Sequence, residues 1–118
     1  MRSAARLRAA GLGGLLALGL MGTAASAAVE CPSTQNGRPL GLVSVFDGPP
    51  AEMVDLRPEA SGKIDMWTAL DQSGRPAFLV CRYRGVTAET TLQLPPGTTT
   101  CRGVRAQDDR SYVSVRCQ

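Results

Sequence analysis

The stretch CRGVRAQDDRSYVSVRC, residues 101–117, contains two short runs of β-prone residues on either side of a polar turn. If Asp108, Asp109 and Arg110 form the loop of a hairpin, Cys101 stands opposite Cys117. One face of the hairpin then carries Cys101, Gly103, Val113, Val115 and Cys117, and the other carries Arg102, Val104, Tyr112, Ser114 and Arg116. Thiol pairing and apolar patterning select the same register, and a slip of one residue would break both.

This register bears on the pairing of the four cysteines, which are Cys31, Cys81, Cys101 and Cys117. Four cysteines allow three connectivities. We expect Cys101 to pair with Cys117 and, by elimination, Cys31 with Cys81. Zinc is disfavoured, because the chain has no C-x-x-C pair and no histidine. In the chain-entropy model, loops of about 15 and about 50 residues would each stabilise the fold by roughly 3 to 4 kcal/mol.

The first 27 residues have the features of an export signal, which makes disulfides plausible. A basic start is followed by an apolar run, 9–21, that contains no charge, and Ala25-Ser26-Ala27 fits the pattern read by signal peptidase. Ser26-Ala27-Ala28 is the alternative cleavage site. The apolar run is too short for a membrane anchor. A lipoprotein signal is also disfavoured, because the acid Glu30 directly precedes Cys31. The sequence therefore predicts a signal peptide, 1–27, and one domain, 28–118, in the periplasm or outside the cell.

Charge argues against a nucleic-acid partner. Three of the thirteen basic residues lie in the predicted leader, so the remaining chain is formally neutral, whereas phosphate binding needs a basic surplus. The charge is unevenly spread: acidic residues dominate 28–74 and basic residues dominate 75–118. We expect the two halves to pair within the molecule. A dipolar surface that docks a protein or an anionic envelope component is the alternative.

Turn signals separate short β-prone segments throughout the rest of the chain. The expected strands are 42–46, 64–70, 77–84, 90–94, 98–106 and 111–117, with 64–70 and 77–84 forming a hairpin and 77–84 lying centrally. One or two helical turns are expected within 50–56, and 32–41 reads as a poorly ordered loop. The sequence thus predicts an all-β domain: a small antiparallel meander sheet or a partly open barrel of about six strands, stapled by two disulfides, with one short helical turn.

Four residues are candidates for binding. The predicted register places Arg102 opposite Arg116, and like charges across a strand pair are unfavourable unless an anion lies between them. Two long side chains splaying into water, an intramolecular acid or an error in the register are the alternatives. In the run Asp47-Gly48-Pro49-Pro50-Ala51-Glu52, the two acids Asp47 and Glu52 flank a turn. We expect a rigid turn in which Asp47 accepts hydrogen bonds from the backbone, and a partner-binding loop is the alternative.

The inventory for catalysis is poor, so we expect no enzyme. The chain has no histidine, no nucleophile elbow, no phosphate-binding glycine loop and no metal-ligand cluster. Acid pairs such as Asp55 with Glu59, or Asp108 with Asp109, could form carboxylate dyads, but they lie in or near predicted turns of a small domain. Trp67, the only tryptophan, is expected to pack against the sheet or the loop after Asp47. No cofactor and no metal are expected.

One family resembles this chain in the order of its motifs. The order is Cys31-Pro32, then Val45-Phe46-Asp47-Gly48-Pro49-Pro50-Ala51-Glu52, Leu56 with Pro58, Trp67, Cys81-x-Tyr83, Leu94-Pro95, Cys101 and Cys117. It is similar to a family of small exported proteobacterial proteins of unknown function, named after a Salmonella locus. The resemblance covers nearly all of 28–118, with shorter spacings after the first cysteine and before the tryptophan. It implies export and a shared scaffold, and it carries over no catalytic residue.

Together these observations predict a small exported binding or interaction module. An inhibitor of a lysozyme-type cell-wall hydrolase is the leading hypothesis, by analogy of size and compartment alone. A structural or stress-related envelope protein without a specific small ligand is the alternative. We expect a protein or an anionic envelope component as partner, no nucleic acid, no membrane span after cleavage of the leader, and a monomer.

Overall fold

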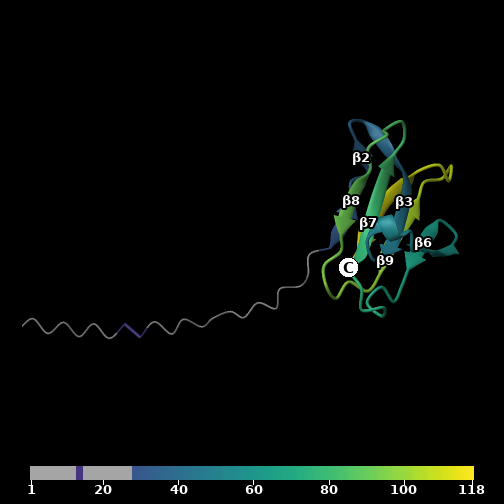
Figure 1. The fold of residues 1–118 in the computed structure, drawn as a ribbon. Helices are drawn as coiled ribbons and strands as arrows, with labels where there is room; N and C mark the ends of the chain where they lie inside the picture. Colours follow the sequence, from purple (N-terminus) through teal and green to yellow (C-terminus); the bar gives the residue numbers. More distant parts are fainter. Residues whose placement is uncertain (1–12, 15–27) are drawn as a thin grey trace, which may run out of the picture.

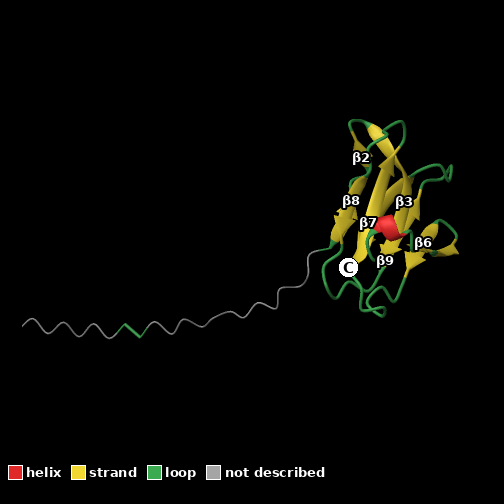
Figure 2. Cartoon of the chain, in the orientation of Figure 1, coloured by secondary structure: helices red, strands yellow, loops and turns green. Residues whose placement is uncertain are grey.

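The computed structural model describes residues 13–14 and 28–118 (Figure 1), so nearly all of the predicted leader, 1–27, lies outside the described residues. Strands dominate the part of the chain that is described, with one short 3-10 helix between them (Figure 2). The elements are β1 (Val29–Cys31), β2 (Thr34–Gln35), β3 (Arg38–Asp47), η1 (Pro50–Glu52), β4 (Asp55–Leu56), β5 (Glu59–Ser61), β6 (Ile64–Trp67), β7 (Ala77–Tyr83), β8 (Thr90–Gln93), β9 (Cys101–Arg105) and β10 (Tyr112–Cys117).

The strands form two antiparallel sheets. The first, which we call the β10 sheet, has the order β1-β10-β9-β6-β5, and the second, the β7 sheet, has the order β2-β3-β7-β8, with β4 also paired to β3. The predicted all-β, antiparallel class is therefore confirmed, with ten described strands. The prediction that β7 is central is also confirmed, because it lies between β3 and β8.

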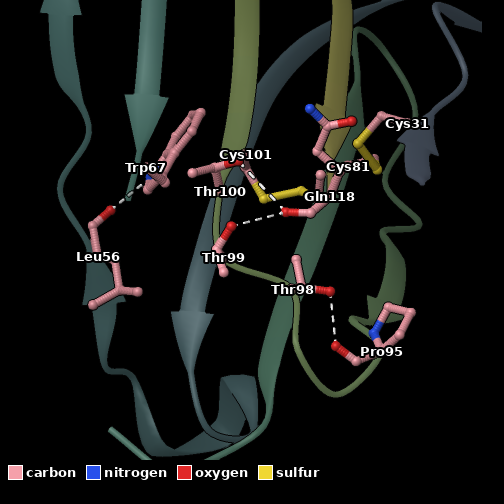
Figure 3. Close-up of a disulfide and its surroundings, with 11 residues drawn as sticks. Cys31, Leu56, Trp67, Cys81, Pro95, Thr98, Thr99, Thr100, Cys101 and Gln118 are labelled. Carbon is pink, nitrogen blue, oxygen red and sulfur yellow. Dashed lines mark hydrogen bonds between the residues drawn. A yellow bond between two sulfur atoms is a disulfide. The ribbon is translucent and has the colours of Figure 1, made fainter. Parts of the chain in front are cut away.

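The core is formed by the facing sides of the two sheets. The β10 sheet contributes buried side chains such as Trp67, Cys101 and Val115, and the β7 sheet contributes Leu79 and Val45 among others. Trp67 is buried as expected, and its indole N–H donates to the carbonyl oxygen of Leu56 at 3.0 Å (Figure 3). A buried indole needs such a partner, because an unpaired N–H would lose its hydrogen bond to water.

Both predicted disulfides are present. Cys31–Cys81 joins β1 in the β10 sheet to β7 in the other sheet, and Cys101–Cys117 joins the neighbouring strands β9 and β10. All four cysteines are buried. One bridge therefore holds the two layers together, while the other lies within a single layer.

The register of the last hairpin is as predicted over most of its length. Cys117 pairs with Cys101, Arg116 with Arg102, and Val115 with Gly103. A bulge between Tyr112 and Ser114 then shifts the pairing, so that Tyr112 stands opposite Arg105. The bulge reverses the predicted faces of Tyr112 and Val113, because an extra residue in one strand inverts the alternation beyond it. Val113 is 60% exposed, whereas Tyr112 packs against the core.

The predicted loop at 32–41 is wrong, because this segment forms the β2–β3 hairpin. Gln35 pairs with Arg38 across Asn36 and Gly37, whose φ angles are 50° and 74°. Two consecutive residues with positive φ are what a two-residue type I′ hairpin turn requires, and Asn-Gly is its preferred sequence. The dipeptide therefore carried a hairpin signal that the loop-like composition around it obscured.

The predicted hairpin of 64–70 with 77–84 is also wrong. β6 pairs with β5 and β9, and β7 pairs with β3 and β8, so the two segments belong to different sheets. The polar residues between the two segments do form a turn, with Gly74 at φ 72°. This turn leads the chain from one sheet to the other and does not close a hairpin. Trp67 and Leu79 both point into the core from opposite layers. A direct hairpin would have placed them in one layer.

Candidate functional site

The outer face of the β10 sheet carries the two predicted binding arginines, Arg102 and Arg116. They are direct neighbours across β9 and β10, as the register required. Their strand neighbours Cys101, Gly103, Val115 and Cys117 are all buried. Because successive side chains of a strand point to opposite faces, burial of these neighbours turns both guanidinium groups outward. Both arginines are exposed.

Strand pairing extends this contact into a row that crosses the whole sheet, which we call the arginine row. From β1 to β5 its members are Glu30, Arg116, Arg102, Met66 and Glu59, each paired with the next. Acids thus stand at the two ends and two guanidinium groups stand side by side within the row. A methionine separates the second arginine from the second acid.

The two arginines differ in their partners. The Nε of Arg116 lies 3.6 Å from a carboxylate oxygen of Glu30, with the two side chains 59% and 60% exposed. An ion pair this exposed contributes little to stability. Arg102 lies between Arg116 and Met66 and has no ion pair or side-chain hydrogen bond among the described residues. The intramolecular acid considered from the sequence is therefore found for Arg116 but not for Arg102.

A groove of about 580 Å³ lies on this face. Its lining includes Glu30, Met66, Arg102, Val113, Ser114 and Arg116. It combines two cations with an apolar side chain from β6 and another from the β10 bulge. Protein partners are recognised by such surfaces, where an apolar contact excludes water and charges set the orientation. Two neighbouring guanidinium groups beside apolar side chains are chemically suited to an anionic group such as a carboxylate.

The other two predicted binding residues, Asp47 and Glu52, lie on the loop after β3 and are occupied within the molecule. The hydroxyl of Ser73 donates to a carboxylate oxygen of Asp47 at 2.6 Å, and the guanidinium of Arg75 pairs with Glu52. The hydrogen bond that Arg75 donates to the Glu52 carboxylate raises the pKa of Arg75 above its usual value. The sequence expected Asp47 to accept bonds from the backbone, but the described contact is to a side chain. These acids hold two loops together.

The predicted pairing of acidic and basic halves is partly realised. Three ion pairs join an acid before residue 75 to an arginine in the second half: Glu52 with Arg75, Asp65 with Arg105, and Glu30 with Arg116. Asp65 is the buried member of this set, and the hydroxyl of Tyr112 donates to it at 2.8 Å. Burial and this hydrogen bond raise the pKa of Tyr112 to about 12.

Of the acid pairs considered as catalytic dyads, Asp55 and Glu59 are exposed on β4 and β5, whereas Asp108 and Asp109 have other contacts. Asp109 pairs with Lys63 and Arg105, and the hydrogen bond from Lys63 lowers the pKa of its carboxyl group. Asp108 accepts the backbone N–H of Arg110. Across the described residues, no group of three or more His, Cys, Asp or Glu side chains is placed to hold a metal ion. Within the same part of the chain, no helix is long and apolar enough to cross a membrane.

Sequence reasoning missed several features of the groove. Val113 was assigned to the core, because nothing in the residue types announces the bulge that turns it outward. Met66 and Glu30 were not singled out, since only the pairing of β6 and β1 with distant strands brings them beside the arginines. A second hollow, of about 330 Å³, lies between residues 70–77 and 93–98 and was not foreseen either.

Comparison with known protein families gives a match over most of the chain. The family model described as "Type VI secretion system Tli immunity protein" matches residues 33–118. The match spans most of the described domain, including the arginines of the groove, and begins two residues after Cys31. The match supports the predicted resemblance to a small proteobacterial family, but not the finer details of that resemblance. No curated protein and no solved structure matches this chain.

Proposed function

We propose that this protein binds a cognate effector protein and blocks it. The chain belongs to the type VI secretion system Tli immunity protein family. Family membership is the observation that carries the proposal, and it supports the small binding module predicted from the sequence over the purely structural or stress-related alternative. In this role the protein is an inhibitor without catalysis of its own. A chain without histidine, in which Asp108 and Asp109 are engaged in other contacts, suits that role.

We further propose that binding takes place in the periplasm. The features of residues 1–27 are those of an export signal, and two buried disulfides suit an oxidising compartment. An effector that damages the envelope would be met there. A lysozyme-type cell-wall hydrolase, the target predicted from the sequence, is the type of effector to test first. The description of the family names no substrate.

The arginine row is the proposed contact surface. Within 28–118, Arg102 has no acid beside it, and the acid that pairs with Arg116 is exposed to solvent. A carboxylate of the effector placed between them would relieve their mutual repulsion across the strand pair. The flanking Met66 and Val113 would contribute apolar contact. Complementary charge of this kind sets orientation and association rate more than total affinity.

Neutralisation of an effector in living cells tests the function. Each type VI effector of the source bacterium is directed to the periplasm of a test strain, with and without this chain, and growth is followed. Rescue from at least one effector is expected. Failure to rescue from any of them would refute the inhibitor role and would favour the structural or stress-related alternative.

The chemistry of the neutralised effector is read with two purified substrates. Release of soluble peptidoglycan fragments from cell walls would support the lysozyme-type target. Release of fatty acid from phospholipid vesicles, with walls left intact, would replace that target by a membrane-degrading one. In either assay, stoichiometric protein should abolish the activity if the chain is an inhibitor.

The surface is tested by reversing its charge. Arg102→Asp with Arg116→Asp should weaken binding to the neutralised effector by about tenfold or more, mainly through slower association. Arg38→Asp with Arg57→Asp is the matched control, because it changes the net charge equally at arginines elsewhere. Equal loss in both double variants would show that only the overall charge matters and would contradict the assigned groove.

A further inference from the structure

We infer that the loop after β3 carries a second contact for the effector: Met53, held outward as an apolar projection that enters an apolar hollow on the partner. This inference rests on the proposed function and adds a contact that lies outside the arginine row. Met53 is 78% exposed and its neighbour Val54 is 40% exposed. No other large apolar side chain among the described residues is as exposed as Met53.

The backbone of this loop is fixed by hydrogen bonds at both ends. The N–H of Asp47 donates to the carbonyl of Val54 at 2.9 Å, and the N–H of Met53 donates to the carbonyl of Pro50 at 3.0 Å. The N–H of Gly48 donates to Pro76 at 2.8 Å and so ties the loop to the crossover segment. Pro49 and Pro50 restrict φ further. The exposed methionine therefore lies on a backbone with little freedom.

Side chains reinforce the same attachment. Arg75 pairs with Glu52 and lies over Gly48, where a Cβ atom would collide with the guanidinium group. The Ser73 hydroxyl reaches Asp47 and also accepts the N–H of Arg75. The two acids predicted from the sequence as binding residues thus act as braces, and their role is to position the loop that they flank.

Met53 itself sits in a conformation that an ordinary side chain avoids. Its φ is 62° and its ψ is 28°, which is the left-handed region, and glycine or asparagine would adopt it at lower cost. The side chain gains no burial in return. Residues held in such sparsely populated backbone conformations cluster at sites where proteins contact their ligands.

Methionine suits such a contact. Its unbranched, polarisable side chain fills irregular apolar hollows, and a loop that is rigid before binding loses less entropy when it docks. The effector is therefore expected to present an apolar hollow at this position, and a charged surface would not fit.

Substitutions at residue 53 test the inference. Met53→Asn keeps a residue that tolerates the left-handed backbone but removes the apolar group, and Met53→Gly serves as a second version. Either change should weaken binding to the purified effector by about tenfold or more, in the range of interface anchor residues. Leu42→Thr, at another exposed apolar residue of 52% exposure, is the control and should bind within about twofold of wild type. All variants should retain both disulfides by intact mass, and none should unfold below the wild-type temperature.

The brace is tested by a double-mutant cycle. Arg75→Ala should weaken binding several-fold in the wild-type background and have little effect when Met53 is already asparagine, because its role is to position that side chain. Wild-type affinity in the residue-53 variants, with effector binding otherwise normal, would overturn this inference and leave the proposed function intact. Absence of effector binding by the wild-type protein would overturn both.

Discussion

The two disulfides lie in regions of the molecule that are held together differently. Cys101–Cys117 joins strands that are already hydrogen-bonded neighbours, with Trp67 paired to Cys101 on the adjacent strand. Around it, the main chain of Gln118 accepts hydrogen bonds from Thr99 and Thr100 (Figure 3). Cys31–Cys81 instead joins two sheets. Cys101–Cys117 therefore reinforces the register of two paired strands, whereas Cys31–Cys81 fixes the packing of the two sheets.

Few polar contacts accompany the bridge between the sheets. The hydroxyl of Tyr83 donates to the carbonyl of Pro32 at 2.6 Å, next to Cys31, and burial raises the pKa of that hydroxyl. β1 is a three-residue strand at the edge of its sheet. We therefore expect the removal of each bridge to have different consequences, as the following predictions state in order of decreasing effect.

Removal of the bridge between the sheets should have the largest effect. Cys31→Ala with Cys81→Ala opens a loop spanning 50 residues, for which the chain-entropy model gives a loss of about 4 kcal/mol. β1 should also lose protection, because its short ladder with β10 would then be the main attachment of this edge strand. Chemical denaturation of protein purified from the periplasm measures the free energy, and hydrogen exchange at β1 measures its protection. Protection of β1 equal to that of wild type would contradict the assigned role.

Removal of the bridge within the sheet should cost less. Cys101→Ala with Cys117→Ala opens a loop spanning 16 residues, for which the same model gives about 3 kcal/mol. The β9–β10 register should persist, since Val115 and Gly103 remain paired in the core. Hydrogen exchange of the β10 amides provides the readout. Loss of their protection below the global transition would show that the bridge, and not the ladder, sets the register.

Gly103→Ala tests the packing that surrounds the bridge within the sheet. An added Cβ would lie 2.9 Å from Cε1 of Tyr112 and 3.6 Å from Cζ3 of Trp67. Displacing an aromatic ring in a packed core should cost about 1 to 3 kcal/mol, and the near-ultraviolet circular dichroism of Trp67 should change. An unchanged spectrum with wild-type stability would mean that this side of the core is loosely packed.

Tyr112→Phe should have the smallest effect at neutral pH, about 1 kcal/mol, because it removes the hydrogen bond to buried Asp65. The folded pKa of Tyr112 is raised to about 12, so the unfolded chain releases this proton first as pH rises. The contribution of Tyr112 to stability should therefore be complete below about pH 10 and be lost as pH rises toward 12.

The pH dependence provides the control for this variant. In the Tyr112→Phe variant, the free energy of unfolding should decline less steeply above pH 10. The part of the decline that Tyr83 contributes should remain. The effect will be reduced by solvent, since Tyr112 is only partly buried. Identical alkaline unfolding of the wild type and the variant would contradict the role assigned to this hydrogen bond.

The last hairpin is the part of the fold that was predicted most completely from the sequence. Two cysteines, a glycine and alternating arginines over 101–117 allow one register, and that register by itself places Arg102 beside Arg116. The prediction ended at the bulge, since the position of an extra residue depends on whether Tyr112 or Val113 packs better against Trp67 and Gly103. That choice is made by the core as a whole.

The candidate site was predictable only in part for a similar reason. Arg102 and Arg116 are close in the sequence through one hairpin, whereas Glu30, Met66 and Glu59 join them through pairings with distant strands. A turn lies between Asp47 and Glu52, but their partners Ser73 and Arg75 come from the crossover segment. The same partners attach the loop on which Met53 lies.

Residue types and spacing alone thus determined that the chain is β-rich, neutral without its predicted leader, poor in catalytic groups and able to close two disulfides. These properties depend on local chemistry or on counting. Only the tertiary structure decided that β6 and β7 lie in opposite layers, that five strands align the arginine row, and that Met53 faces solvent. Pairing between strands far apart in the chain is selected by the burial of a shared core, and no short stretch of sequence contains that information.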